Sequence, residues 1–328
     1  MADTRSARSA RLGVEEFEQR LTPAGFILSG PLAGQASVVR VLDATTGAVK
    51  LQFDAFPGYT GGLNVAASAD RNGDGLPDRI AIGTKSGPGI AAVYDGASGR
   101  LLQGFLPYGD NYRGAVSVAF ADVNRDGVDD AVTGTAVATS LVKVFDGRSQ
   151  VEVRSILAFG GFSGGVNVGS GDINRDGFDD VIVGSASVAA GVAVYDGRTS
   201  EQIRFLALGL LPGGVRVAGG DLDHDGGDDI VVATGPGTTP LVGVFRGSDM
   251  SFLGGGQVFE STYIGGVELE VHDISGDGRD DLVVGRHSGG ARFRAFDDGP
   301  AHDINDDRQS LALEPGDDSG GRNRGNGR

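Results

Sequence analysis

Five aspartate-rich segments of nine residues recur along the chain at intervals of 52, 50, 49 and 52 residues, beginning at Asp70, Asp122, Asp172, Asp221 and Asp273. Each follows the pattern D-x-[D/N/S]-x-D-G-x-x-D, so side-chain oxygens recur at positions 1, 3, 5 and 9. Glycine at position 6 permits a backbone turn that other residues resist, and position 7 can add its backbone carbonyl. An all-oxygen ligand set suits a hard cation, and it favours calcium because magnesium demands a stricter octahedron and usually keeps several waters.

We therefore expect about five calcium ions, one for each segment. The expected ligand positions are Asp70, Asn72, Asp74, Leu76, Asp78, Asp122, Asn124, Asp126, Val128, Asp130, Asp172, Asn174, Asp176, Phe178, Asp180, Asp221, Asp223, Asp225, Gly227, Asp229, Asp273, Ser275, Asp277, Arg279 and Asp281. The segments hold 20 of the 44 acidic residues, and five calcium ions would change the formal net charge from -16 to -6. The last site is expected to bind calcium most weakly, because Ser275 replaces an amide or carboxylate at position 3 and Arg279 places a cation at position 7. The alternative is that Asp-Gly turns close hairpins and the surplus carboxylates are solvated.

The sequence around each acidic segment predicts four short antiparallel strands, because apolar and polar residues alternate. In the third copy these strands are 165–170, 181–184, 191–195 and 202–207. The Asp196-Gly197 pair is expected to supply the positive φ of the tight turn between the last two strands. Four strands repeated radially form the blade of a β-propeller. The sequence thus predicts an all-β propeller of four-stranded blades, six in number, with five or seven as the alternatives.

The ends of the chain set the expected domain boundaries. Residues 25–297 are assigned to the propeller, residues 1–24 to a partly disordered leader or tail, and residues 298–328 to a polar, largely disordered tail. The first blade has no clear inner strand, which residues 14–17 or 310–313 could supply. The last blade has no convincing outer strand.

These repeats resemble the FG-GAP/VCBS repeats of the integrin α-subunit head and of many bacterial surface proteins. The resemblance covers residues 25–297 and rests on the acidic segments, which match D-h-D-x-D-G-h-x-D, where h is apolar. Arg71, Gly227 and Arg279 depart from the apolar positions, and the phenylalanine-glycine signature is partial, at Phe159-Gly160. The resemblance implies a calcium-stabilised propeller used in extracellular adhesion or recognition, and some related propellers belong to polysaccharide lyases.

Several segments resemble catalytic motifs without the required context. Residues 161–165 match G-x-S-x-G, but the same register holds turns between blades in the other repeats, so Ser163 is expected in an ordinary turn. The four histidines share no spacing, which gives a zinc or general-base role little support. The glycine-rich residues 235–239 precede no helix and form no phosphate cradle. We predict no catalytic residue.

In an antiparallel blade, the loops between first and second strands emerge on the same face as the turns between third and fourth strands. Calcium is thus expected on one face, and a partner on the other. There the turns before successive inner strands carry one large apolar residue each, and the candidate ligand-binding residues are Tyr59, Tyr112, Phe162 and Tyr263. Aromatic rings on loops of a rigid scaffold suit sugar stacking or a protein hot spot. The alternative is that each ring packs as a wedge between blades.

Composition narrows the classes of partner and compartment. A net charge of -16 disfavours nucleic acid, and the absence of cysteine excludes disulfides and thiolate metal sites. The sequence contains no run of 18 or more apolar residues, so no membrane-spanning helix is expected. No apolar stretch follows Arg5, Arg8 and Arg11, so a standard secretion signal is missing. Residues 14–24 resemble the LE-x-R-x-x-P leader of some exported surface proteins, and an amphipathic strand or turn is the alternative.

We therefore expect a monomeric, calcium-stabilised binding or adhesion module, extracellular or in the cell envelope, with a protein or glycan ligand. The first alternative is a carbohydrate-active enzyme of the polysaccharide lyase kind, which would need a cluster of Lys, Arg, His or Tyr at the central face. The second alternative is a passive spacer or display domain.

Overall fold

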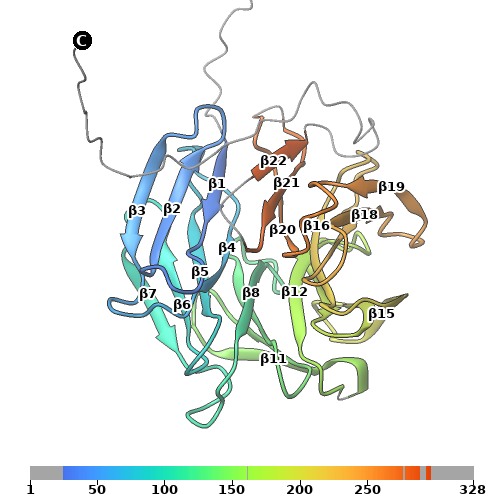
Figure 1. The fold of residues 1–328 in the computed structure, drawn as a ribbon, viewed down its shortest axis with the longest axis horizontal. Coiled ribbons are helices and arrows are strands. Elements are labelled where there is room, and N and C mark those ends of the chain that lie inside the picture. The colour runs from blue at the N-terminus through green and yellow to red at the C-terminus, as the bar shows by residue number, and fades with distance from the viewer. Residues whose placement is uncertain (1–24, 161, 276–277, 289–292, 297–328) are drawn as a thin grey trace, which may run out of the picture.

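The computed structural model describes residues 25–160, 162–275, 278–288 and 293–296. Strands β1 to β22 pair into six antiparallel sheets, which surround a central axis as the blades of a propeller (Figure 1). The prediction of an all-β, six-bladed propeller with mainly four-stranded blades is confirmed. No helix in the described part of the chain is long and apolar enough to cross a membrane.

The blades are numbered in chain order, and each is built from consecutive strands. Blade 1 contains β1 (Phe26–Ser29), β2 (Val38–Asp43) and β3 (Val49–Asp54). Blade 2 contains β4 (Leu63–Ala67), β5 (Arg79–Thr84), β6 (Ala91–Asp95) and β7 (Leu101–Phe105). Blade 3 contains β8 (Val116–Ala121), β9 (Asp130–Thr135), β10 (Leu141–Phe145) and β11 (Glu152–Leu157), followed by a single 3-10 turn (Ala158–Gly160). Blade 4 contains β12 (Val166–Gly171), β13 (Asp180–Ser185), β14 (Ala189–Tyr195) and β15 (Gln202–Leu210). Blade 5 contains β16 (Val215–Gly220), β17 (Asp229–Thr234), β18 (Leu241–Phe245) and β19 (Phe252–Gln257). Blade 6 contains β20 (Val267–His272), β21 (Asp281–Arg286) and β22 (Phe293–Phe296).

The core lies between the faces of adjacent blades. The second strands β9, β13 and β17 are buried along their whole length, whereas the outer strand β15 alternates between exposed and half-buried residues. One cluster joins Ile182 and Val192 of blade 4 to Val215 and Ile230 of blade 5. Sheets whose two faces are both covered need apolar residues at successive positions, which is why the second strands read as continuous aliphatic runs.

Blade 1 closes the ring without an inner strand in the described part of the chain. Its innermost strand, β1, faces blade 6, where Glu270 Oε2 accepts a hydrogen bond from the Leu28 amide at 3.3 Å. The His272 ring stacks on Phe26 with centroids 4.5 Å apart, and its Nε2 lies 2.8 Å from the Phe26 carbonyl oxygen. Side chains of β20 thus hydrogen bond directly with the backbone of β1. The two candidate inner strands, 14–17 and 310–313, lie outside the described residues.

The turn between β14 and β15 corrects one prediction. The left-handed residue is Ser200, with φ of 63°, and Gly197 is not among the residues of positive φ. Glycine is required at 197 for space instead, because a Cβ there would lie 1.9 Å from the carbonyl oxygen of Asp179. The Asp196 carboxylate caps the turn by accepting the Thr199 amide at 2.7 Å. The Asp-Gly pair therefore works through capping and close approach, not through positive φ at the glycine.

Candidate calcium loops and the central channel

The acidic segments connect the first and second strands of blades 2 to 6, as the sequence predicts. The position-6 glycines have left-handed φ angles of 78° to 89°. In blade 3 the position-1 carboxylate of Asp122 accepts the amides of Asp126 at 3.0 Å and Gly127 at 2.9 Å. The bond from the position-6 amide to the position-1 carboxylate recurs in all five loops. All five loops therefore share this bond and lie in equivalent places.

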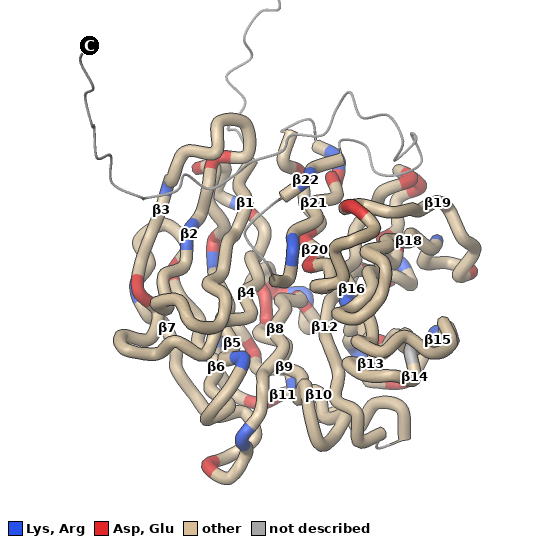
Figure 2. Tube along the Cα trace, viewed as in Figure 1, with Lys and Arg blue, Asp and Glu red and all other residues tan. Residues whose placement is uncertain are grey.

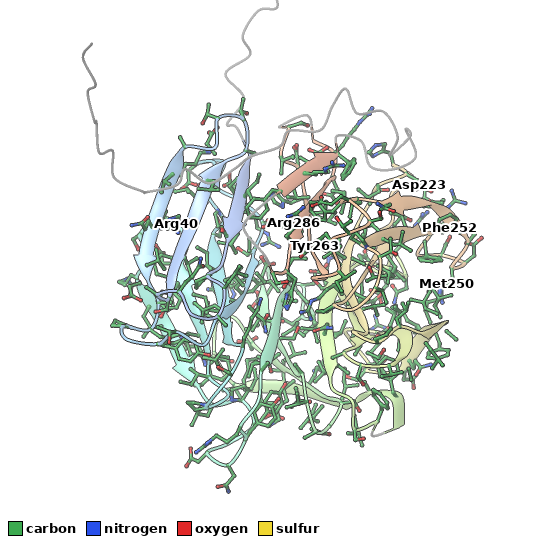
Figure 3. All side chains as sticks on the ribbon, in the orientation of Figure 1. Arg40, Asp223, Met250, Phe252, Tyr263 and Arg286 are labelled. Atoms are coloured by element: carbon green, nitrogen blue, oxygen red, sulfur yellow. The ribbon has the colours of Figure 1, made fainter. Side chains whose placement is uncertain are left out.

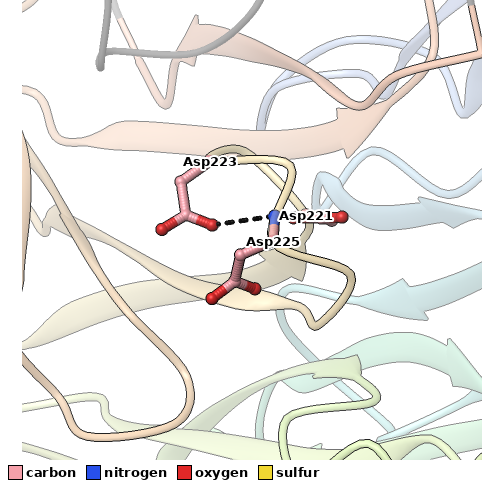
Figure 4. Close-up of side chains that lie close together, drawn as sticks. All are labelled: Asp221, Asp223 and Asp225. Atoms are coloured by element: carbon pink, nitrogen blue, oxygen red, sulfur yellow. Dashed lines mark hydrogen bonds between the residues drawn. The ribbon is translucent and has the colours of Figure 1, made fainter.

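The fourth loop brings three carboxylates together. Asp221, Asp223 and Asp225 occupy positions 1, 3 and 5, and one ligand oxygen from each lies within 4.8 Å of the others (Figure 4). The Asp225 amide is held between Asp221 Oδ1 at 3.1 Å and Asp223 Oδ1 at 3.2 Å. Backbone amides orient these oxygens without neutralising them, and an all-oxygen set of this kind fits a hard divalent cation.

In blades 3 to 5 the position-9 aspartate is buried and connects the acidic loop to the turn on the same face. Asp130 accepts the Gly147 amide from the β10–β11 turn at 2.7 Å and the Val123 amide from its own loop at 3.2 Å. Asp180 and Asp229 likewise accept the turn amides of Gly197 and Gly247, and from their own loops they accept the position-3 amide in place of the position-2 amide. Burial raises the pKa of Asp130, Asp180 and Asp229 to about 7. These contacts place the acidic loops and the third-to-fourth-strand turns on one face, as predicted.

The first loop departs from this pattern. Strand β5 begins at Arg79, one residue after Asp78, whereas in blades 3 to 6 the strand begins at the position-9 aspartate itself. Asp78 is half-buried and accepts the side-chain amide of Asn72 at 3.1 Å. In the last loop, Asp277 lies outside the described residues. Asp281 there accepts the Ser275 amide at 2.9 Å.

Arginines neutralise some of the loop carboxylates. Arg148 Nε donates to Asp126 Oδ2 at 2.7 Å in blade 3, and Arg246 Nε donates to Asp223 Oδ2 at 2.9 Å in blade 5. Arg175, from the third loop, forms an ion pair with Asp225 of the fourth. At the fourth loop, Arg246 and Arg175 contact carboxylate oxygens that a cation could use, so they would compete with a cation there.

Position 8 carries a set of aspartates that the sequence pattern leaves unassigned. The Asp179 carboxylate accepts the Asp122 amide of the preceding blade at 2.7 Å, and Asp228 accepts the Asp172 amide at 2.7 Å. Burial raises the pKa of Asp228 to about 7. At blade 3 this position pairs with Arg71. The position-8 aspartates thus connect one blade to the next. The Asp-Asp pair that ends the second to fifth acidic segments is the sequence signal that could have indicated this role.

Tyr263 packs inside the blade assembly. It is 9% exposed, its hydroxyl donates to the Gly266 carbonyl oxygen at 2.7 Å, and the Ser288 amide donates to the same hydroxyl at 3.2 Å. The Arg286 guanidinium lies 4.5 Å from the ring centroid (Figure 3), and the ring meets Phe259 edge-on. The Ser288 and Arg286 contacts tie the turn before β20 to blade 6, and Tyr263 belongs to an apolar cluster that joins blades 5 and 6.

The other three aromatic candidates are half-buried and make comparable contacts. The Tyr112 hydroxyl donates to the Ala115 carbonyl oxygen at 2.7 Å, and the Tyr59 hydroxyl donates to the Ser86 carbonyl oxygen at 2.8 Å. Phe162 packs edge-on against Phe159. This geometry favours the wedge interpretation, while a binding role for the four residues stays a prediction. Ser163, beside Phe162, is exposed in the turn before β12.

The inner strands β4, β8, β12, β16 and β20 surround a cavity at the centre of the propeller, here called the central channel. It contains a cluster of charged side chains that the sequence pattern did not predict. Lys85, Arg216, Glu268 and His287 come from blades 2, 5 and 6 and line a cavity of about 620 Å³. Arg216 and Glu268 are the second residues of their inner strands, and Lys85 and His287 each follow a second strand directly. Comparing these equivalent positions across the repeats is the sequence signal that could have found the cluster.

No protein-family model matches the sequence, and no curated protein matches it. Among the solved structures that match is one described as the Dos1 propeller, with 15% sequence identity and a TM-score of 0.47. The match covers 83% of this chain and 64% of that chain. The chain thus spans less than two thirds of the length of the structure it matches, and the fold assignment rests on the strand pairing itself.

Proposed function

We propose that the protein is a calcium-stabilised, non-catalytic binding module of the FG-GAP/VCBS kind. The observation that carries the proposal is the fourth loop, where Asp221, Asp223 and Asp225 converge in an oxygen-only arrangement. The first three loops have Asn in place of Asp223 and repeat the bond from the position-5 amide to the position-1 carboxylate. The position-9 carboxylate lies beside these groups, since Asp223 and Asp225 both raise the pKa of Asp229 in addition to its burial.

Calcium would neutralise carboxylates that the fold forces together. Positions 1, 3, 5 and 9 would supply side-chain oxygens, and position 7 its backbone carbonyl. A cation held in this way joins the acidic loop to the second strand of its blade, so its binding free energy adds to the stability of the folded state. Among the described residues, the first and third loops have no ion-paired arginine on their position-1 or position-5 aspartates, whereas the second and fourth loops do.

Calcium-dependent stability suits an extracellular or cell-envelope setting, where we place the module. We propose a protein or glycan partner, bound by a monomer on the face opposite the calcium loops. The second and third strands are joined on that face, and no acidic loop lies there to repel an anionic or polar ligand.

A carbohydrate-active enzyme is the second candidate, and one observation favours it. Lys85, Arg216 and His287 meet in the central channel, which is the kind of cluster that such an enzyme requires. Incubation with a panel of acidic and neutral polysaccharides, followed by analysis for shortened and unsaturated products, separates the candidates. Product formation that His287→Ala abolishes would establish the enzyme and refute the non-catalytic module.

Calcium titration by calorimetry, with native mass spectrometry, tests the main proposal. We expect four to five bound ions per chain, and a melting temperature that falls markedly in excess chelator, because each site adds about 2.7 kcal/mol when calcium is about 100 times its Kd. Asp225→Asn should remove one ion. Asp249→Asn, an exposed change of the same charge in the β18–β19 turn, should remove none. One ion or none, with an unchanged melting curve in chelator, would mean that the loops are only turns.

A further inference from the structure

The central channel has ends of opposite charge. The position-8 aspartates lie at the calcium-loop end, where Asp129, Asp179 and Asp228 line the channel wall. The charged cluster of Lys85, Arg216, Glu268 and His287, here called the channel cluster, lies at the other end, because Lys85 and His287 begin the loops on the opposite face. The strands between are five or six residues long, which separates the ends by about 15–20 Å. Figure 2 shows blue and red segments side by side at the centre, where β8, β12 and β20 meet.

The channel cluster is joined by contacts between residues distant in sequence. Lys85 Nζ lies 3.3 Å from Glu268 Oε1, and Arg216 Nε lies 3.2 Å from Glu268 Oε2. His287 Nδ1 lies 3.3 Å from Arg216 Nη2 and 3.5 Å from Lys85 Nζ, and it also contacts Glu268 Oε1. Arg216 reaches Asn167 of blade 4 as well. Four groups from three blades therefore point to one place.

The channel cluster holds an excess of basic groups. Lys85 and Arg216 are two basic groups against the single carboxylate of Glu268, so the basic groups of the cluster outnumber the acidic one, although burial lowers the pKa of Lys85. Although burial opposes ionisation, Arg216, Lys85 and His287 hold the pKa of Glu268 well below its usual range. Lys85 and Arg216 keep only 19% and 20% of their side-chain surface exposed. A surplus charge with so little contact to solvent is costly unless an anion accompanies it.

The neighbouring wall is polar but uncharged. The second residues of the inner strands β4, β8 and β12 are Asn64, Ser117 and Asn167, and all three line the same cavity. The amides of Asn64 and Asn167 each donate to the adjacent blade, to Val116 O at 2.8 Å and Val215 O at 2.7 Å. The Asn64 carbonyl oxygen and the Ser117 hydroxyl can still hydrogen bond with a ligand's hydroxyl groups.

We propose that the channel cluster binds a small hydroxylated molecule carrying one carboxylate group, the chemistry of a sugar acid. Arg216 and Lys85 bind the carboxylate, and Glu268 and His287 hold these two cations in place. The Asn64 carbonyl oxygen and the Ser117 hydroxyl bind hydroxyl groups of the ligand. A single surplus basic group matches a monoanion better than a phosphate dianion. The inference rests on the proposed function as a binding module and specifies its ligand.

Calorimetric titration of the calcium-loaded protein with sodium glucuronate tests the proposal, with glucose as the uncharged match. Glucuronate is expected to bind, and glucose at the same concentrations is not. Loss of a charge-assisted hydrogen bond predicts that Arg216→Gln and Lys85→Met each weaken glucuronate binding about 10-fold or more. Arg113→Gln is the matched control, an exposed arginine on the same face outside the channel, and should leave the affinity within about twofold because exposed charges are screened.

The outcomes separate this inference from the proposed function. Calcium binding without a difference between glucuronate and glucose, or binding of inorganic phosphate in place of glucuronate, overturns the sugar-acid site alone. Unchanged glucuronate binding by a folded Arg216→Gln variant overturns it as well. If that variant does not melt cooperatively, Arg216→Lys keeps the charge and removes the planar fork. Weakened binding by Arg216→Lys supports the site, and unchanged binding overturns it.

Discussion

Replacing Tyr263 decides whether the aromatic residue before an inner strand is a packing wedge. The ring is 9% exposed, packs against Phe259, and lies beneath the Arg286 guanidinium. Removing a buried aromatic ring costs about 3–5 kcal/mol. Tyr263→Phe keeps the ring and removes only the hydroxyl that bonds Gly266 and Ser288, which costs about 1–2 kcal/mol.

The assay is thermal unfolding in saturating calcium, with ligand binding measured on the same samples. A domain of this size loses about 2 °C of melting temperature per kcal/mol. We expect Tyr263→Ala to melt about 6–10 °C lower than wild type and Tyr263→Phe about 2–4 °C lower. Ile264→Ala is the control, because the neighbouring side chain is 57% exposed and surface changes stay within about 0.5 kcal/mol.

A melting temperature for Tyr263→Ala within about 1 °C of wild type would refute the wedge argument. The ring would then contribute little packing, and a binding defect in the same variant would assign Tyr263 to recognition. A large loss of stability with no separable binding defect removes Tyr263 from the recognition face.

Two further predictions concern charge. Arg246→Gln should tighten calcium at the fourth loop about two- to fivefold in calorimetry, because removal of a partly exposed ion pair frees Asp223 and Asp225; weaker binding would show that Arg246 supports the site. Burial raises the pKa of Glu270, so its contribution to stability is complete below the unfolded pKa of about 4.3 and is lost as pH rises through the higher folded pKa. Glu270→Gln should therefore melt above wild type at pH 8, with the difference shrinking toward pH 4, and a difference independent of pH would contradict this.

The propeller could be predicted because the same residue types recur at equivalent positions of each repeat. Position-6 glycines at intervals of about 50 residues mark equivalent turns, and the aliphatic runs after them mark the buried second strands. The strand β13 (Asp180–Ser185) extends the predicted 181–184 by one residue at each end. The first loop was harder, because Asp78 matches the pattern in sequence while strand β5 begins one residue later.

The channel cluster could not be predicted in the same way, because its contacts cross the ring. Lys85 and Glu268 are 183 residues apart, and Lys85 and His287 are 202 apart. Each residue interrupts its own repeat: alanine or glycine stands at the positions equivalent to Lys85 in blades 3, 4 and 5. A repeat pattern records only what the blades share, so it does not include residues such as Lys85. In a symmetric fold, however, a single binding site depends on residues that differ between the repeats.

The place of the channel cluster follows from how the ring closes. In a complete ring, the inner strand of blade 1 would separate the inner strands of blades 2 and 6. Among the described residues that strand is missing, so Lys85 of blade 2 reaches Glu268 of blade 6 directly, and Glu270 takes the Leu28 amide of β1. Strand β20 has two acidic side chains on the channel side, Glu268 and Glu270, where the corresponding positions of β12 are Asn167 and Gly169. Blades 2 and 6, the two neighbours of the incomplete blade 1, are thus the blades whose unlike charges meet at the centre of the propeller.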